Sequence, residues 1–382
     1  MLSRELKADL DRRVLAAQEL MRARDLGALV AVCAGAPQYN GWMRYFTNAE
    51  AWGGRVFVVV RPDAMARHIV MRSTYDAEWV RRQAVDTTVD STLIQQAEPV
   101  ARTTEIVGEI THGRGRIGMI RSADLTPPEH DALARALPAV EVVDVTDAMA
   151  AIREIKSPFE IEAIRETGRL QARALDRFSS RTRLGRSAAE AAGDVDGYLR
   201  GRGCFWGRIT LSFDLRQSRL PAPHGRRFTR DDVVVLHLTH SGPQGYWSQT
   251  ARVLSFRDLP KDSGRLLETA EQAMREAVKT AVPGGAYSAM RAAVDRVFND
   301  GGFRVVGDYG AYCRSTGSDE DDGRAPQADD WVFNENMVLA IHPAPILEGG
   351  HGIRLAETIL VRDGGGVSLI PSQRTLERIE AE

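Results

Sequence analysis

The chain has 382 residues, of which 43% are hydrophobic and 27% charged, and its formal net charge is −2. This composition predicts a soluble globular protein with room for two domains. The nearly balanced charge argues against nucleic acid or a membrane surface as a partner. The three cysteines lie far apart without metal-binding spacing, which is typical of a reducing compartment. The charged start predicts no signal peptide, and no apolar run reaches the ~18 residues of a membrane span, so we expect a cytoplasmic protein.

The first part of the chain alternates between strand and helix patterns. Apolar, β-branched runs predict strands at 28–35, 55–60, 68–71, 116–120 and 140–145. Amphipathic spacing predicts helices at 4–26, 78–84 and 128–138. Strands that alternate with helices in this way are typical of an α/β domain.

The next segment predicts two helices that break at Ser157. Ser157 has the side chain of an N-cap, Pro158 suits the first helical position, and Glu160 completes a capping box. We place the domain boundary just before this break, which gives domains of residues 1–154 and 155–382.

The second part of the chain predicts an α+β domain. Long helical patterns cover 187–201, 260–280 and 286–300. Strand patterns lie at 208–213, 232–240, 250–256, 337–346 and 354–362, with glycine-rich turns between the elements. These strands are expected to be antiparallel and linked as hairpins.

Six segments resemble one known family. IREIKSPFEIEAIR, at 152–165, resembles the hinge sequence of the creatinase/aminopeptidase P/prolidase family, the pita-bread hydrolases. Five more segments resemble parts of that family and occur in the same order. They are MRYFTN, the stretch around PAPHG, GYWSQTARV, NMVLAIHPAPILEG and GGHGIRLAETILV. The resemblance spans nearly the whole chain. It implies an α/β N-terminal domain followed by an α+β pita-bread catalytic domain, as in creatinase.

The resemblance also implies where metal ligands would lie. The family's peptidases hold two metal ions with two Asp, one His and two Glu. Carried over in order, these positions fall on His237 or Leu238, Gln249, Thr316, His342 and Ala356, the last with Glu357 beside it. Two divalent cations need several anionic oxygen ligands, which this set does not supply. The sequence therefore predicts no di-metal centre.

The leading hypothesis is a metal-independent, creatinase-like hydrolase or lyase that cleaves a C–N bond of a small amino-acid-derived substrate. The resemblance to creatinase implies that His224, in the PHG segment, is the general acid or base. Imidazole suits that task because its ordinary pKa of ~6.5 lies near working pH. His342 and His237 would complete the proton-handling set, and Gln249 would orient a water or an amide.

Four residues are predicted to bind the substrate. Arg324 falls where the resemblance places an arginine that holds a substrate carboxylate, which an arginine fork matches well. Family dimers bring the N-terminal domain over the partner's pocket, so we expect a homodimer in which Arg44 reaches the partner's site. Trp247 would supply an aromatic wall, and Arg354 is a further candidate for substrate binding.

Two other hypotheses remain open. One is an Xaa-Pro peptidase-like enzyme whose site is rebuilt around a single transition metal at His237 and His342, since imidazole suits such ions. The other is a non-catalytic pita-bread module that binds a peptide or a protein. The acidic run SDEDDG, at 318–323, is typical of a solvated loop, with a clamp for a cationic substrate as the alternative.

Overall fold

The computed structural model describes two compact units, Met1–Arg153 and Glu154–Glu382, and their division lies one residue before the boundary expected from the sequence. Among the described residues, no helix is long and apolar enough to cross a membrane. The described residues are 4–34, 41–52, 54–72, 76–91, 99–217, 220–308, 312–323, 331–371 and 375–379.

The first unit is built on one mixed sheet in the order β4-β3-β2-β1-β5-β6. β2 pairs antiparallel with both β1 and β3, whereas the other three strand pairs are parallel. The expected α/β domain is therefore confirmed. Its strands are β1 (Ala28–Ala34), β2 (Arg55–Val60), β3 (Arg67–Met71), β4 (Thr87–Ser91), β5 (Arg114–Ile120) and β6 (Ala139–Asp144).

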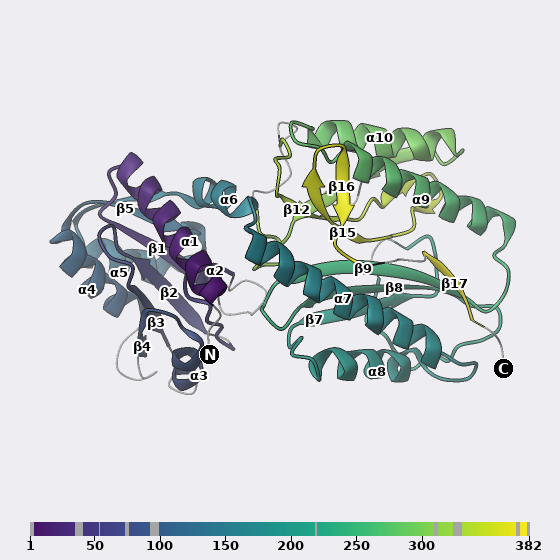
Figure 1. The fold of residues 1–382 in the computed structure, drawn as a ribbon, viewed down its shortest axis with the longest axis horizontal. Coiled ribbons are helices and arrows are strands. Elements are labelled where there is room, and N and C mark those ends of the chain that lie inside the picture. The colour runs from purple at the N-terminus through teal and green to yellow at the C-terminus, as the bar shows by residue number, and fades with distance from the viewer. Residues whose placement is uncertain are drawn as a thin grey trace. The chain divides into compact units, whose positions relative to one another are not determined.

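Helices cover both faces of this sheet (Figure 1). Side chains of β1 alternate between the two cores: Leu29 and Ala31 pack with α1 and α2, whereas Val30 and Val32 pack with α4 and α5. This alternation is what a strand buried on both faces requires. The helices are α1 (Arg4–Ala23), α2 (Gly41–Thr47), α3 (Ala77–Gln83), α4 (Pro99–Thr111), α5 (Pro127–Ala136) and α6 (Thr146–Glu154).

The sequence analysis did not predict α2, β4 or α4. Helix α4 is rich in β-branched residues, which favour strands in isolation. The Thr103 hydroxyl donates to the carbonyl of Pro99, and the Thr111 hydroxyl to that of Val107. The hydroxyl of Thr104, the third buried threonine, donates to the carbonyl of Ala101. All three hydroxyls are thus satisfied within the helix itself, so they do not prevent its burial.

The second unit holds two four-stranded sheets, in the orders β17-β9-β8-β7 and β11-β12-β15-β16, and the smaller sheet β10-β13-β14. The expected α+β architecture is confirmed. Its helices are α7 (Pro158–Arg181), α8 (Ala188–Arg200), α9 (Lys261–Thr280) and α10 (Tyr287–Asp300). Its strands are β7 (Gly207–Ser212), β8 (Val233–Ser241), β9 (Trp247–Ser255), β10 (Val305–Asp308), β11 (Cys313–Ser315), β12 (Val338–Ile341), β13 (Pro345–Leu347), β14 (Gly350–His351), β15 (Glu357–Arg362), β16 (Gly365–Ser368) and β17 (Leu376–Arg378).

One strand expected at 337–346 is divided in the structure. β12 ends at Ile341 and β13 begins at Pro345. Pro343 lies between them, and neither proline has an N–H group to donate to a neighbouring strand. The chain therefore leaves one sheet after His342 and enters another.

The two four-stranded sheets meet where β9 lies next to β15. The backbone N–H of Gln249 donates to the Thr358 hydroxyl, which in turn donates to the Gln249 carbonyl, at 2.9 and 3.0 Å. The backbone N–H of Ala251 donates to the carbonyl of Ala356 at 3.2 Å. These bonds make the two sheets one continuous surface at this point.

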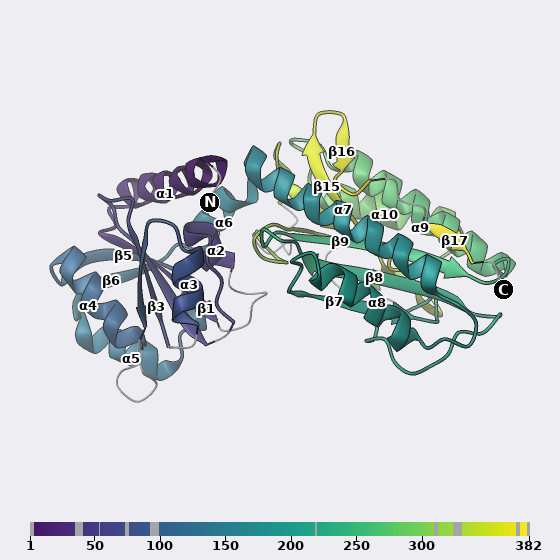
Figure 2. The same ribbon diagram turned by 60° about the horizontal axis from the view of Figure 1, so that its bottom comes forward.

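Two helix pairs pack on these sheets. α7 and α8 pack on the β7–β9 sheet, where Leu236, Leu238 and Leu254 join one hydrophobic core (Figure 2). α9 and α10 lie side by side over the other sheet, where Leu339 and Ile341 join a second core. The opposite faces are packed in part as well, since Val235 and Val253 join the core of α9 and α10, and Val338 and Leu360 pack against α7. These faces also carry the polar side chains described below.

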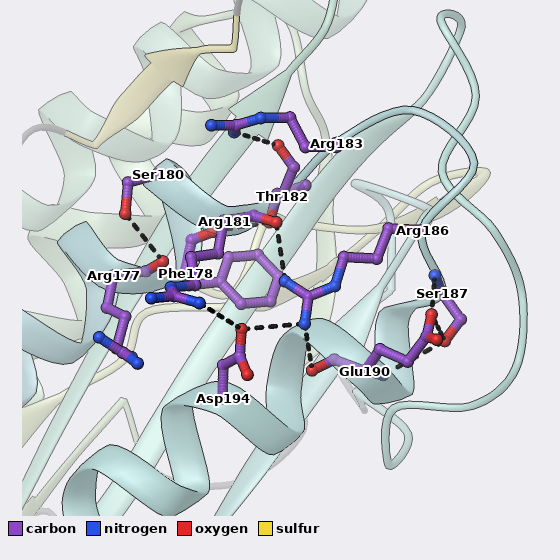
Figure 3. Close-up of polar contacts among 10 residues, drawn as sticks. All are labelled: Arg177, Phe178, Ser180, Arg181, Thr182, Arg183, Arg186, Ser187, Glu190 and Asp194. Atoms are coloured by element: carbon purple, nitrogen blue, oxygen red, sulfur yellow. Dashed lines mark hydrogen bonds and ion pairs between the residues drawn. The ribbon is translucent and has the colours of Figure 1, made fainter.

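The connection from α7 to α8 is held by one arginine (Figure 3). The Arg186 guanidinium donates to the carbonyls of Arg181 and Glu190 and pairs with the Asp194 carboxylate, at 2.9, 3.1 and 2.9 Å. Ser187 caps α8 and forms a capping box with Glu190. Together these contacts fix α8 against α7 and hence against the sheet.

The predicted capping box at the start of α7 is confirmed, since Ser157 and Glu160 exchange both expected hydrogen bonds. Just before it, the Lys156 ammonium lies 2.8 Å from the Asp322 carboxylate, and both side chains are fully buried. The Ser318 hydroxyl also donates to Asp322. The interpretation of the acidic run as a solvated loop is therefore wrong at Asp322, which ties the loop to the start of α7.

Breaking the buried pair should destabilise the second unit strongly. Lys156→Met leaves the Asp322 carboxylate buried without its cation, so we expect a loss of about 3–5 kcal/mol in the free energy of unfolding. Urea unfolding of the full chain measures it. The control Lys279→Met, in an exposed pair with Glu276, should stay within about 0.5 kcal/mol of the parent chain. A loss below about 1 kcal/mol for Lys156→Met would contradict this role of the pair.

Candidate functional site

The register of the β8–β9 hairpin decides which side chains share a face. His237 lies opposite Ala251, and Thr239 opposite Gln249, so these four side chains point to the same side. Leu238 points to the other side, into the core under α7 and α8. His237, and not Leu238, therefore occupies the first of the expected ligand positions.

Strand β7 adds an arginine to this face. Arg208 lies opposite Thr239, in the same row as Gln249. Trp247 follows the same alternation along β9 and is buried, and its backbone N–H donates to the carbonyl of Gly317 at 2.7 Å. The predicted aromatic wall residue is thus placed beside Gln249 and against the segment that carries Thr316.

The second sheet contributes residues in the same way. Arg314 lies opposite Ala340, which lies opposite Thr358. The backbone N–H of Thr316 donates to the carbonyl of Val338, which extends the pairing by one residue beyond Ser315. Because side chains alternate along each strand, three further residues lie on the same side as Arg314 and Thr358: Thr316, His342 and Ala356.

Glu357 points the opposite way, across from Ile341 and toward the core of α9 and α10. Burial raises the pKa of its carboxyl group. Because β9 and β15 are joined, the polar faces of the two sheets are continuous. We call this combined surface the site face, defined by the expected ligand positions His237, Gln249, Thr316, His342 and Ala356.

Three polar atoms of the site face have no hydrogen-bond partner among the described residues. They are Nε2 of His237, Oε1 of Gln249 and Oγ1 of Thr316, and the three side chains are 3%, 1% and 0% exposed. Buried polar atoms are normally paired, so such orphans call for an explanation such as a ligand or a water. All three stand at expected ligand positions, which marks the site face as the candidate functional site.

Both histidines of the site face are neutral at pH 7. Burial, then Arg354 and Arg314, lower the pKa of His342 to about 3. The pKa of His237 lies well below its usual value because of burial, then of Arg354 and His342. The positive charge of Arg354 therefore acts on both rings. The Thr239 hydroxyl is 3.3 Å from Nδ1 of His237, which helps to orient that ring.

The acidic run holds two of the arginines in place. Glu320 makes two hydrogen bonds to the Arg208 guanidinium, and Asp321 pairs with Arg314. Both arginines lie on site-face positions of their strands. The run is anchored at Asp322 and Glu320, whereas the Asp321 side chain stays 55% exposed. It folds the segment that carries Thr316 over the two sheets.

The site face does not fit a pair of divalent metal ions. Its expected ligand positions hold two neutral imidazoles, an amide, a hydroxyl and a methyl group, where hard cations need carboxylates. The described part of the chain contains no group of three or more His, Cys, Asp or Glu residues that could hold a metal ion. For a single transition metal, the two imidazoles supply only two of the three or four protein ligands that such sites use.

The contacts of His224 lie at the start of α8 and with Phe213, not with the residues of the site face. The residue lies on an exposed segment whose backbone bonds to the first turn of α8, and its Nδ1 accepts from the backbone N–H of Arg226. Its ring lies 6.3 Å from Phe213, which packs against the core of α7 and α8. The acid–base role of His224 therefore stays a prediction from the sequence.

The other predicted binding residues have different outcomes. Arg354 acts on both site histidines. Arg44 lies on α2 of the first unit, paired with Glu50, and its approach to a partner's site stays a prediction. Arg324 lies outside the described residues. The sequence analysis missed Arg208 and Arg314, whose only local signal is their spacing within a strand.

Two family profiles match the chain. Residues 162–363 match metallopeptidase family M24, and residues 13–155 match the creatinase/prolidase N-terminal domain. The alignments with curated relatives are shorter. The protein named "Probable dipeptidase PepE" of Mycobacterium tuberculosis is 24% identical over 253 residues, which is 62% of this chain and 64% of that relative. The Xaa-Pro dipeptidase of Pyrococcus furiosus is 24% identical over 62% of this chain and 68% of its own length.

Solved structures share the fold over nearly the whole chain. The X-Pro aminopeptidase from Thermotoga maritima superposes with a TM-score of 0.83 and 15% identity, covering 96% of this chain and 99% of that one. The prolidase from Pyrococcus horikoshii superposes with a TM-score of 0.78 and 19% identity, covering 96% of this chain and 100% of that one. The expected pita-bread fold is confirmed.

The buried histidines predict how stability depends on pH. His342 binds a proton near pH 6.5 when unfolded but only near pH 3 when folded, so acid favours unfolding. Lowering the pH from 7 to 5 should cost about 2 kcal/mol through this residue alone. Urea unfolding of the parent chain and of His342→Gln at both pH values measures the difference. The control His130→Gln, at an exposed position, should lose as much stability between pH 7 and pH 5 as the parent chain does. If His342→Gln also loses as much as the parent chain, the pH dependence does not come from His342.

Proposed function

Because the chain belongs to metallopeptidase family M24, we propose that it is a hydrolase that cleaves the amide C–N bond of a small, dipeptide-sized substrate. The relatives named as dipeptidases support this substrate class over a guanidino acid. The observation that carries the proposal is the set of orphaned polar atoms on His237, Gln249 and Thr316, all on one face. A bound substrate and its attacking water would satisfy them.

In the proposed reaction His237 is the general base. When its Nδ1 carries the proton, Nδ1–H donates to the Thr239 hydroxyl, and the lone pair of Nε2 is left to accept a proton. Water gives that proton to Nε2 while its oxygen bonds to the carbonyl carbon. The C–N bond then breaks, and the imidazolium returns the proton to the departing amine.

The carbonyl oxygen gains negative charge in this step and needs hydrogen-bond donors. The Thr316 hydroxyl and the NH₂ group of the Gln249 side chain are buried donors on the same face. The orphaned Oε1 of Gln249 is an acceptor and suits the attacking water. Fixed donors in a dry site stabilise an oxyanion strongly because they need no reorganisation during the reaction. Each proton transfer in this scheme uses the chain's own side chains, so independence from metal is part of the proposal.

One alternative remains for a peptidase of this family. His237 and His342 are neutral, and Nε2 of His237 has no partner among the described residues, so the two rings suit a single transition metal ion. That ion would need a further ligand that the described residues do not supply. Elemental analysis of the purified chain separates the two mechanisms: close to one equivalent of one metal favours the alternative, and no bound metal in active protein favours the proposal.

His237→Ala should lower kcat/KM by about 10²–10⁴-fold, because the base is lost while substrate contacts remain. Release of free amino acid from a panel of dipeptides, Xaa-Pro dipeptides included, measures it. His240→Ala is the matched control, since His240 lies on the same strand but faces α8, next to Gly207 and Asp196. It should retain activity in folded protein.

Two results would contradict this assignment. Equal activity in folded His237→Ala and in the parent chain removes His237 as the base. The absence of hydrolysis of every dipeptide by the parent chain, with and without added divalent metal, removes the proposed function.

A further inference from the structure

We infer that the protein binds a small phosphate-bearing molecule in a groove between α7 and β17, outside the site face. The groove lies within the second unit, on the other side of the β7–β9 sheet from the site face. Arg252, which lines it, shows which side this is, because it lies opposite Leu236, and Leu236 packs in the core under α7 and α8. The inference therefore does not depend on the proposed hydrolysis.

Two adjoining cavities form the groove, with volumes of about 510 and 350 Å³. They share two lining residues, Asp176 of α7 and Glu377 of β17. Volumes of this size are typical of sites for small molecules. Five arginines line the groove as well: Arg169, Arg173 and Arg252 in the larger cavity, and Arg183 and Arg378 in the smaller one. Guanidinium groups therefore outnumber carboxylates among the described residues that line the groove.

Arg252 is the buried part of this groove. It lies on β9 beside the edge strand β17 (Figure 1), and its side chain is 4% exposed. Its Nη1 lies 2.9 Å from carboxylate oxygens of both Asp176 and Glu377, and 3.3 Å from the Ser179 hydroxyl. Its Nε is buried and has no hydrogen-bond partner among the described residues. Both carboxylates of the groove are thus engaged at one end of this guanidinium, which still has donors to spare.

Two further arginines of the larger cavity lie one helical turn apart on α7. Arg169 pairs with Glu162 at 2.8 Å, whereas Arg173 has no ion pair or hydrogen bond with a described residue. Both side chains are exposed at the rim of the cavity. Like charges four residues apart on a helix repel each other. An anion bound between the two guanidiniums turns this repulsion into attraction.

The smaller cavity has the same excess of positive charge. Arg183 donates to the carbonyl of Thr182 and has no carboxylate partner among the described residues. Arg378 pairs with Asp258, whose side chain is 88% exposed. Exposed pairs of this kind neutralise each other weakly because water screens them. The groove as a whole therefore suits a ligand with negative charge and not a cation.

The arrangement of the guanidiniums favours a phosphate over a carboxylate. They reach the larger cavity from two elements, Arg169 and Arg173 from α7 and Arg252 from β9. A phosphate monoester has three acceptor oxygens and close to two negative charges at pH 7, so arginines of different elements can share it. A carboxylate has one oxygen and about one charge fewer. The volume of the cavity leaves room for the organic part of the molecule beside the phosphate.

Calorimetric titration of the full chain with phenyl phosphate tests the inference, at fixed ionic strength because salt screens exposed charges. We expect about one equivalent to bind. Arg173→Gln should weaken the binding by about tenfold or more, since a hydrogen bond between charged groups is lost. The control Arg275→Gln removes the same charge from α9, where Arg275 donates to the side chain of Gln272. It should bind phenyl phosphate as the parent chain does.

Arg173 is exposed, so Arg173→Gln should fold as the parent chain does, which thermal unfolding checks. The absence of binding by the parent chain would overturn the inference. Equal affinity of folded Arg173→Gln and of the parent chain would do the same, because the ligand would then bind elsewhere.

Two further probes test the chemical class of the ligand. Benzoate carries a carboxylate in place of the phosphate, and benzoate that binds as tightly as phenyl phosphate would contradict the phosphate assignment. Inorganic phosphate lacks the organic part. Weaker binding of inorganic phosphate than of phenyl phosphate supports an organic phosphate as the ligand, and tighter binding would contradict it.

Discussion

The pairing of His237 with Ala251 across the β8–β9 hairpin is the constraint on which the whole site depends. Side chains alternate along a strand, so a slip of one residue would send His237 into the core of α7 and α8 and bring Leu238 to the site face. The core prevents that slip, because Leu236, Leu238 and Leu254 fill it and cannot be replaced there by imidazole and amide groups at low cost. Apolar packing on one face thereby fixes the chemistry of the other.

A second constraint brings the remaining site residues to this hairpin. The acidic run uses Asp322 to hold Lys156 at the start of α7, and Glu320 and Asp321 to hold the arginines of two different strands. Thr316 lies on the same short segment. A run that would be an ordinary solvated loop in many proteins is here part of the scaffold, and it also sets the charge of the site.

Much of the fold follows from local patterns in the sequence. The strands of both units, the capping box at Ser157 and the opposite facing of Ala356 and Glu357 all depend on spacing of two to four residues. The site depends on longer distances. Arg208 meets Glu320 112 residues away, and Lys156 meets Asp322, so no local pattern reveals either pair. A local motif can also suggest a role that the contacts do not support. The motif around His224 predicts a site residue, whereas its backbone is hydrogen-bonded to the first turn of α8.

The central claim is that the site face hydrolyses a small amide with its own side chains and without a metal ion. Elemental mass spectrometry of the purified chain, combined with dipeptide hydrolysis by the same protein sample, tests it most directly. The account predicts hydrolysis by protein that holds no bound transition metal. Close to one equivalent of a transition metal in the active protein, with hydrolysis abolished by a chelator, would contradict it.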